Sequence, residues 1–326
     1  MVSSSFLRSG LTLASLAVLS QVNGQAHPHK KWGPWSPPLP PSVTQTAPVP
    51  TETSSSASPK NLLAAAYSLV DDYNPSNFFT MFSFFTGTDP TNGFVEYVDE
   101  ATAQGAGLIQ TNSDSVYIGV DHTNMAPNGR QSVRLGSTKS YTHGLFIADI
   151  AHMPGGICGT WPAFWTVGPN WPSAGEIDII EQVNDASTDQ STLHSNPGCT
   201  MSGGSQSGSV AGTDCDATAN GNAGCGVVDS NTASYGSGFN DGQGGVYAME
   251  WTSSQIAVWF FPRSSIPGDA LGSNPDPSGW GTPTANFQGP CDIDANFNNH
   301  QIVFDNTFCG DWAGNVWAGS SCAANT

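Results

Sequence analysis

Short apolar runs separated by dense turn residues make up most of the chain beyond residue 60. Runs of this length that are rich in β-branched and aromatic residues are typical of strands. The predicted strands are 115–120, 144–150, 246–251, 256–261 and 301–304. The run at 256–261 is apolar on both faces, which suits a strand inside a sandwich. Long helical periodicity is missing, so the pattern predicts one all-β domain of two packed sheets over residues 61–326.

The first residues follow a different pattern. Arg8 precedes an apolar run at 11–19, and small residues follow up to Gly24. A basic start, a short apolar run and small residues after it are typical of a secretory signal peptide. We therefore expect residues 1–24 to be a signal peptide cleaved at or near Gly24, and the protein to be secreted, extracellular or in the cell wall. The run is too short to span a bilayer comfortably.

Pro, Ser and Thr dominate the next segment, residues 25–60, where periodic apolar positions are almost absent. Such a segment cannot bury enough apolar surface to offset the entropy that it loses on ordering. Its composition predicts a disordered linker between the signal peptide and the domain.

The sequence GEIDIIE at 175–181 holds three carboxylates within six residues. Its isoleucines favour a strand, and the turn-forming residues in front of it mark where that strand begins. Glu176 and Asp178 would point to the same face, because side chains alternate along a strand. Strict alternation would send Glu181 to the opposite face, whereas one extra residue, a β-bulge, would bring it back. The two glutamates would then approach the separation that glycoside hydrolysis requires.

Other interpretations of these carboxylates are weaker. Like charges on one face of a strand destabilise it, so a purely structural role is a poor explanation. A calcium site would use several carboxylate oxygens, but the loop-type spacing of Asp and Asn ligands is absent. Neither a metal nor another cofactor is therefore expected. Carboxylates with separate acid, base and nucleophile roles are the leading interpretation.

The stretch at 175–181 belongs to a larger set of motifs along the chain. The central ones are CGTWPAFW at 158–165, WP at 171–172, GEIDIIE at 175–181 and VND at 183–185. Others are TLH at 192–194, SYG at 234–236, WFFPR at 259–263 and FCGDWAG at 308–314. Together they resemble glycoside hydrolase family 16, and more narrowly its fungal endo-1,3(4)-β-glucanases, the laminarinase-like branch. The resemblance covers approximately residues 65–318. It implies a concanavalin-like β-jelly-roll sandwich whose cleft binds β-glucan chains.

The resemblance also implies how the three acids divide the work. In retaining hydrolysis by double displacement, Glu176 would attack the anomeric carbon and form a glycosyl-enzyme intermediate. Glu181 would protonate the leaving oxygen and then act as base for the incoming water. Asp178 would hydrogen-bond one glutamate and tune its charge. Local chemistry alone does not tell Glu176 from Glu181.

Four further residues are expected to contact substrate on the strength of the resemblance: Trp165, Trp171, His194 and Trp312. A Trp is more often a core residue than a cleft residue, because burial of its large ring dominates core energetics. Trp165 and Trp171 lie just upstream of the acids, where a loop would enter the cleft. His194 keeps two interpretations: a structural residue on a strand, or a contact to sugar or to the acid/base.

Charge restricts the partners. The chain has 26 acidic and 8 basic residues, a formal net charge of −18, and only 10% charged residues. Phosphate backbones and anionic membranes would be repelled, which excludes nucleic acid and membrane surfaces as partners. A neutral polysaccharide needs flat apolar platforms instead, which the ten Trp residues can supply. The expected partner is a β-glucan, and the protein is expected to be a monomer.

Two alternatives to a hydrolase stay open. A cell-wall transglycosylase of the same family would use the same acids, with a sugar hydroxyl in place of water. A non-catalytic glucan-binding protein would keep the aromatic platforms but would not need both Glu176 and Glu181. The linkage preference among β-glucans does not follow from the sequence.

The chain has seven cysteines, an odd number. In a secreted protein an even set would form disulfides, so one cysteine lacks a partner. Fungal relatives usually continue past the region of Cys322 with another cysteine and a closing strand. The sequence leaves open whether this domain lacks its last strand, and with it the missing partner.

Overall fold

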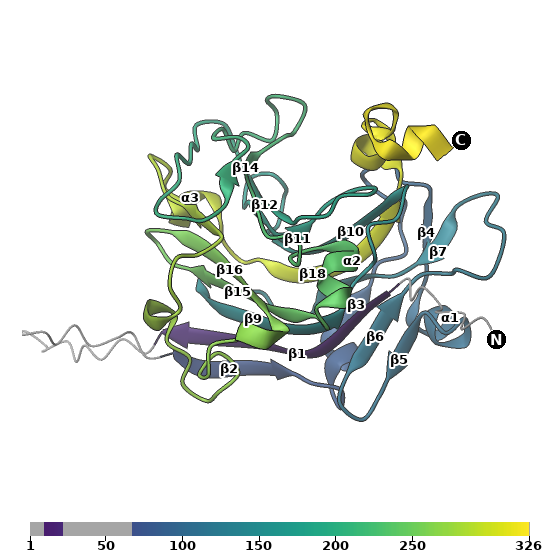
Figure 1. Cartoon of the computed structure of the whole chain (residues 1–326), viewed down its shortest axis with the longest axis horizontal. Helices are drawn as coiled ribbons and strands as arrows, with labels where there is room; N and C mark the ends of the chain where they lie inside the picture. Colours follow the sequence, from purple (N-terminus) through teal and green to yellow (C-terminus); the bar gives the residue numbers. More distant parts are fainter. Residues whose placement is uncertain (1–9, 22–66, 326) are drawn as a thin grey trace, which may run out of the picture.

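The computed structural model describes residues 10–21 and 67–325. Two eight-stranded antiparallel sheets pack face to face (Figure 1). A short parallel pair, β4 (Val95–Tyr97) and β7 (Arg130–Ser132), completes the strands. This arrangement confirms the predicted all-β jelly-roll sandwich. The linker predicted for 25–60 lies outside the described residues.

The first sheet, which we call the back sheet, has β9 and β1 at its centre. Its strands in order are β17 (Ala285–Phe287), β16 (Ile256–Pro262), β15 (Gly245–Trp251), β9 (Gly144–His152), β1 (Gly10–Gln21), β6 (Val116–Gly119) and β5 (Ile109–Thr111), and β2 (Tyr67–Tyr73) also pairs with β1.

The second sheet, which we call the cleft sheet, carries the acidic motif. Its strands in order are β13 (Ser209–Val210), β14 (Cys225–Val228), β12 (Gln190–His194), β11 (Glu176–Glu181), β10 (Thr160–Val167), β18 (Gln301–Phe308), β8 (Arg134–Ser137) and β3 (Phe82–Phe84). β18 comes late in the chain yet lies between β10 and β8, so the centre of this sheet is built from distant segments. The described α-helices are short: α1 (Glu100–Gly105), α2 (Gly236–Asp241) and α3 (Ile293–Asn296).

The main core lies between the two sheets. Phe164 of β10 and Phe304 of β18 stack there with ring centroids 4.6 Å apart. A second apolar cluster covers the outer face of the back sheet, where Trp280 packs edge-on against Trp259 and Phe261. The back sheet is therefore apolar on both faces. This explains why the run at 256–261 does not alternate.

All five predicted strands are present. They correspond to β6, β9, β15, β16 and β18, and β18 runs on to Phe308, beyond the predicted end at 304. The extension carries Asp305 and Thr307 into the cleft region, where polar residues interrupt the apolar pattern that the prediction followed.

The apolar run that predicted a signal peptide is an interior strand in this structure. β1 pairs with β9 along one edge and with β2 and β6 along the other. In Figure 1 it crosses the back sheet as the purple arrow. Cleavage near Gly24 stays a prediction. In the described part of the chain, no helix has the length and apolar character needed to cross a membrane.

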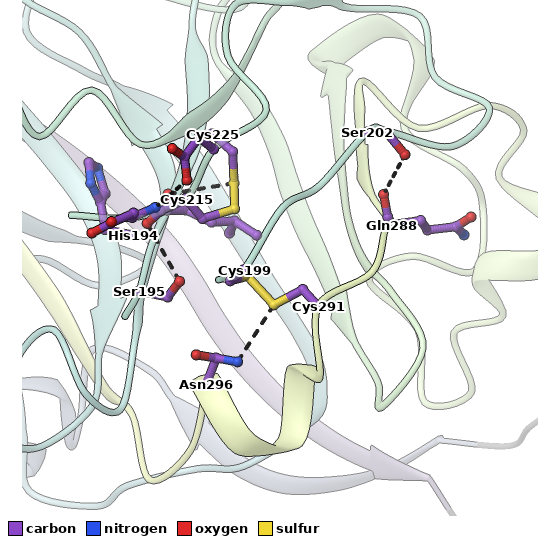
Figure 2. The surroundings of a disulfide bond; sticks show 12 residues. His194, Ser195, Cys199, Ser202, Cys215, Cys225, Gln288, Cys291 and Asn296 are labelled. Carbon is purple, nitrogen blue, oxygen red and sulfur yellow. Dashed lines mark hydrogen bonds between the residues drawn. A yellow bond between two sulfur atoms is a disulfide. The ribbon is translucent and has the colours of Figure 1, made fainter. Parts of the chain in front are cut away.

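Six of the seven cysteines form disulfides: Cys158–Cys322, Cys199–Cys291 and Cys215–Cys225. Figure 2 shows the last two on neighbouring segments close to His194. Cys309 is the free thiol and is exposed. The odd count thus corresponds to one unpaired cysteine at the end of β18.

Candidate active site

Strand β11 contains the bulge that the acidic motif required. Phe164 of β10 pairs with Ile180, and its neighbour Trp165 pairs with Asp178, so Ile179 is the extra residue. The pairing of β11 with β12 shifts at the same place. Ile179 and Ile180 are both buried in the core, with 1% and 5% of their surface exposed. Because two consecutive isoleucines face inward, Glu181 returns to the face that carries the other two acids.

The three carboxylates lie on the floor of a cleft of about 1090 Å³ on the outer face of the cleft sheet. Strands β10, β11, β12, β14 and β18 supply this floor. The 211–224 segment and the 311–315 segment also line the cleft, and Figure 1 shows them rising on either side of the sheet. All seven residues predicted for the site line this one cleft: Trp165, Trp171, Glu176, Asp178, Glu181, His194 and Trp312.

Asp178 and His194 are the most buried of the seven predicted site residues. Asp178 is 1% exposed and His194 is 6% exposed. His194 Nε2 lies 3.4 Å from Asp178 Oδ2, and its Nδ1 is 2.9 Å from Asn222 Oδ1. Among the described residues, Asp178 Oδ2 has no hydrogen-bond partner. A buried carboxylate oxygen without a donor favours the protonated form of that carboxyl.

One ligand atom each from Glu176, Asp178 and His194 lie within 4.8 Å of one another. Two carboxylate oxygens and an imidazole nitrogen at this separation could hold a metal ion. The same atoms are those that the carboxylate chemistry needs. That the site works without a metal stays a prediction.

Glu181 is held from two sides. The Trp161 indole donates a hydrogen bond to Glu181 Oε1 at 2.7 Å. The backbone N–H of Glu181 donates to Asp189 Oδ1 at 3.1 Å. Trp312 packs edge-on against Trp161, with ring centroids 5.7 Å apart. The carboxyl is therefore oriented by an aromatic pair that also lines the cleft.

Burial and the charge of Asp178 raise the pKa of Glu176 to about 8. The same two causes raise the pKa of Glu181 to about 8, while the Trp161 hydrogen bond opposes the rise. Burial raises the pKa of Asp178 well above its usual range, and the charge of Asp305 adds to this. Protons on this cluster are thus shared among three carboxyls at neutral pH, and its titration belongs to the group rather than to one residue.

The predicted tryptophans differ in how they face the cleft. Trp171 is 46% exposed and hydrogen-bonds Glu176, so it presents an open ring beside the acids. Trp165 is only 8% exposed. Its indole donates to Asp305 Oδ1 at 3.1 Å, and the Arg134 guanidinium lies 4.9 Å from its ring centroid. One face of Trp165 is thus already covered, and its stacking against sugar stays a prediction.

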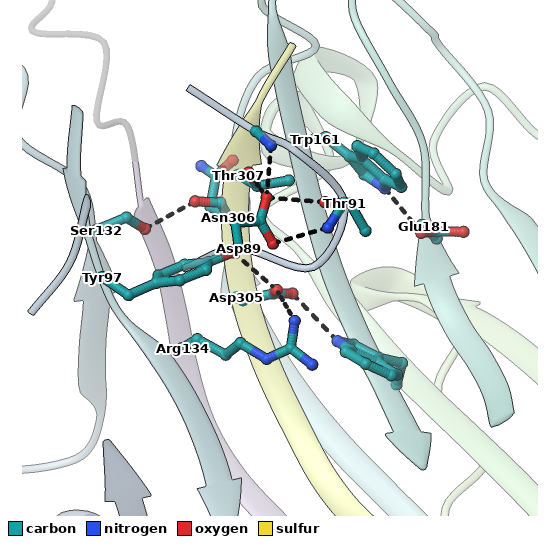
Figure 3. A network of polar contacts seen from close by, with 12 residues as sticks. Asp89, Thr91, Tyr97, Ser132, Arg134, Trp161, Glu181, Asp305, Asn306 and Thr307 are labelled. Atoms are coloured by element: carbon teal, nitrogen blue, oxygen red, sulfur yellow. Dashed lines mark hydrogen bonds and ion pairs between the residues drawn. The ribbon is translucent and has the colours of Figure 1, made fainter. Parts of the chain in front are cut away.

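Sequence reasoning missed several residues of this site. Figure 3 shows Tyr97 and Arg134 converging on Asp305, beside the pair of Trp161 and Glu181. Trp161 had a signal, because Trp161 and Trp165 are four positions apart on β10 and alternation puts them on one face. Asp305 and Arg134 had none, since β18 and β8 are far from the motif in sequence.

Comparison with known proteins agrees with this geometry. The profile of the XgeA-like catalytic domain of glycoside hydrolase family 16 matches residues 82–326. A probable endo-1,3(4)-β-glucanase of Aspergillus niger is 48% identical over 263 residues, which are 79% of this chain and 35% of that protein. The chain spans only 35% to 58% of the length of the curated relatives that it matches.

Two solved structures are also similar. An elongating family 16 β-1,3-glucosyltransferase is 52% identical, with a TM-score of 0.72 over 76% of this chain and 84% of that one. Laminarinase 16A from Phanerochaete chrysosporium, solved with two β-glucans in its donor and acceptor sites, is 42% identical. Its TM-score is 0.75 over 78% of this chain and 88% of that one. With a profile match over more than half of its residues, the chain belongs to the XgeA-like group of glycoside hydrolase family 16.

Proposed function

We propose that the protein is a retaining endo-β-glucanase that hydrolyses β-1,3 and mixed β-1,3/1,4 glucans. The observation that carries this proposal is the bulged strand β11, with Glu176, Asp178 and Glu181 on one face at the floor of a large cleft. The names of the A. niger relative and of the Phanerochaete laminarinase support the substrate class.

In this proposal Glu176 attacks the anomeric carbon while Glu181 gives its proton to the leaving oxygen. Water then attacks the anomeric carbon from the side that the leaving group vacated, opposite Glu176; Glu181 takes a proton from the water as base, and the bond between the carbon and Glu176 breaks. A pKa near 8 suits Glu181 for this role, because the carboxyl stays protonated until the leaving oxygen needs the proton. Trp161 would hold Glu181 in place and stabilise its ionised form between the two steps.

Glu176 must be ionised to act as the nucleophile. The buried Asp178 helps if it carries a proton itself, because a neutral carboxyl no longer repels a charge on Glu176. A protonated Asp178 can also donate a hydrogen bond to Glu176. The positive potential of His194 and the hydrogen bond from Trp171 lower the pKa of Glu176 in the same sense. A protonated Asp178 would thus raise the share of molecules in which Glu176 is ionised and Glu181 neutral, which is the form that reacts.

The charges of the cleft favour a neutral sugar chain. Among the described residues that line it, Arg134 is the only Lys or Arg, and Asp305 lies 3.6 Å from its guanidinium. The carboxylates are more numerous: Glu176, Asp178, Glu181, Asp214, Asp305 and Asp311. A polysaccharide with carboxylate or sulfate groups would be repelled. We also propose that the protein is secreted and acts as a monomer.

Glucan transfer is the second candidate, because a family 16 β-1,3-glucosyltransferase is 52% identical to this chain. Both reactions share the glycosyl-enzyme and differ only in the acceptor. A laminarin oligosaccharide of defined length separates them. A hydrolase releases reducing ends as fast as bonds break, whereas a transferase makes products longer than the substrate without a net gain of reducing ends.

The decisive experiment incubates the purified protein with laminarin, lichenan, chitin and xyloglucan and follows product sizes and reducing ends. We expect laminarin and lichenan to shorten rapidly by internal cleavage while chitin and xyloglucan stay intact. Glu181→Gln should be inactive, whereas Glu100→Gln on α1, an exposed glutamate outside the cleft, should match the wild type. No new reducing ends from either glucan would refute the proposal.

A further inference from the structure

Strand β1 joins parts of the back sheet that have no other strand pairing between them. Along one edge it pairs with β9 over 12–19. Along the other edge it pairs with β6 over 10–13 and with β2 over 16–21. Among the described strands, β2 pairs with β1 alone. Without β1 the back sheet would separate into three pieces with open edges.

β1 fills the space between β9 on one side and β2 and β6 on the other, which we call the channel. The residues around the channel are apolar on both faces of the sheet. Leu13, Leu16 and Val18 lie in the core between the sheets, and each is no more than 2% exposed. Leu19 points to the opposite face and packs in the outer cluster that contains Trp280. Apolar burial on both faces is the main force that would hold any strand in this channel.

The fit of β1 is nevertheless irregular. Its pairing with β9 shifts register on both sides of Leu13, and its pairing with β2 shifts between Val18 and Leu19. A cavity of about 40 Å³ remains beside Leu11 and Ile118. Backbone pairing and apolar burial therefore hold the segment more than side-chain complementarity does. Such recognition is the mode by which a separate extended peptide adds to a sheet.

The segment also ends before the expected cleavage point. β1 stops at Gln21, and the predicted signal-peptidase site is at Gly24. A cut there would leave every paired residue of β1 on the released peptide. A signal-peptide core and a strand buried on both faces need the same apolar composition, so one segment can serve as both.

We propose that the channel between β9 and the edges of β2 and β6 is a strand-acceptor site. Its occupant is this chain's own N-terminal segment, Gly10–Gln21, bound antiparallel to β9. Pairing and burial hold the segment in place, so it stays bound after the covalent link to the domain is cut. This site is separate from the glucan cleft and does not depend on the proposed activity.

The test uses the full chain with a protease recognition sequence inserted after Gly24 and a tag before Met1, produced without secretion so that the N-terminus is kept. After the cut, gel filtration in native buffer should show the 1–24 peptide eluting with the domain. The peptide should separate only when denaturant unfolds the domain. Release of the peptide from the cut protein in native buffer, whether the domain then stays folded or unfolds, would overturn the proposal.

A second measurement avoids variants that fail to fold. The cut wild-type protein is incubated in denaturant just below its unfolding midpoint with an excess of fluorescent Gly10–Gln21 peptide. We expect the label to exchange into the domain. A Leu16→Asp peptide should be incorporated at least about tenfold less, because it would bury an unpaired charge. A Ser20→Asp peptide, altered at an exposed position, should match the wild type. Equal incorporation of the two Asp peptides would also overturn the proposal.

Discussion

At the scale of single residues, the two catalytic candidates are alike in burial and pKa and differ in their partners. Glu176 accepts a hydrogen bond from the Trp171 side chain, which lies on a loop. Glu181 accepts one from the Trp161 indole on the neighbouring strand β10. Their roles can therefore be separated only by chemistry that treats nucleophile and acid differently. The expected differences concern the leaving group and the stereochemistry of the product.

Glu181→Ala should lower kcat on laminarin by about 10²–10⁴, because glucan is a poor leaving group that needs a general acid. The variant should still be glycosylated by an aryl β-glucoside oligomer with an acidic phenol. Azide should then restore turnover, since it needs no base, and the product should be the β-azide. Glu176→Ala should fail on both substrates, and azide should give the α-azide by direct attack. Proton NMR of the glycosyl azides distinguishes these products. The opposite pairing of variant and anomer would reverse the assigned roles.

Trp161→Phe tests how the indole acts on Glu181. The variant keeps an aromatic ring against Trp312 but loses the donor to Glu181 Oε1. That hydrogen bond lowers the pKa of Glu181, so its loss should raise the pKa further, by roughly one unit. The basic limb of the pH profile of kcat/KM should move up by this amount. Trp317→Phe, which alters a half-buried ring that does not line the cleft, should leave the limb in place. An unshifted limb in Trp161→Phe would show that Glu181 is not the group that must be protonated.

At the scale of elements, strand β11 works because its bulge changes the phase of alternation by one residue. The extra residue, Ile179, is buried, so the core holds the bulge in place. The bulge also leaves the ladder on either side intact: Trp165 pairs with Asp178, and Ala163 pairs with Glu181.

Deletion of Ile179 should therefore preserve the site. Plain alternation would then keep all three acids on the cleft face. The variant should lose about 2–4 kcal/mol of unfolding free energy with the buried side chain, yet retain laminarin hydrolysis. Insertion of one Ala after Ile179 is the matched opposite: it also removes the need for a bulge, but it places Glu181 two strand steps, roughly 7 Å, farther from Glu176 than the deletion does, so it should abolish activity. Denaturant melts and laminarin assays measure both effects. Equal activity of deletion and insertion variants would mean that the spacing of Glu176 and Glu181 along β11 does not position the site.

At the scale of the whole molecule, buried carboxyls make folding depend on pH. Glu176 and Glu181 have folded-state pKa values of about 8, raised from an ordinary value of 4.5. Between these values the folded protein binds more protons than the unfolded chain, so the free energy of unfolding falls as pH rises. Burial lowers the pKa of His300 from 6.5 to about 4, which acts in the opposite sense between those two values.

We therefore expect the steepest loss of stability between about pH 6.5 and 8, where only the carboxyl contribution remains. The double variant Glu176→Gln with Glu181→Gln should flatten this slope. At pH 8 it should gain at least about 1–2 kcal/mol, or roughly 2–6 °C in Tm, because ionisation of the two carboxyls in the unfolded chain no longer opposes folding. Thermal melts across this range check the effect, with Glu100→Gln as the control. A slope unchanged in the double variant would contradict the raised pKa values.

The sequence by itself determined what depends on local alternation and composition. The five predicted strands follow from runs of apolar residues, and the need for a bulge follows from the spacing of Glu176, Asp178 and Glu181. The presence of one unpaired cysteine also followed from the odd number of cysteines in the chain. These are properties of neighbouring residues, so no knowledge of distant segments was required.

Only the tertiary structure decided which distant residues meet. Asn222 reaches His194 from a loop, and Arg134 reaches Asp305 across neighbouring strands, because the order of strands in a sheet differs from their order in the chain. It also decided the place of β1. A signal peptide and a strand buried on both faces have the same apolar sequence pattern. Whether such a run becomes a strand depends on whether the folded domain offers unpaired strand edges on both sides of it.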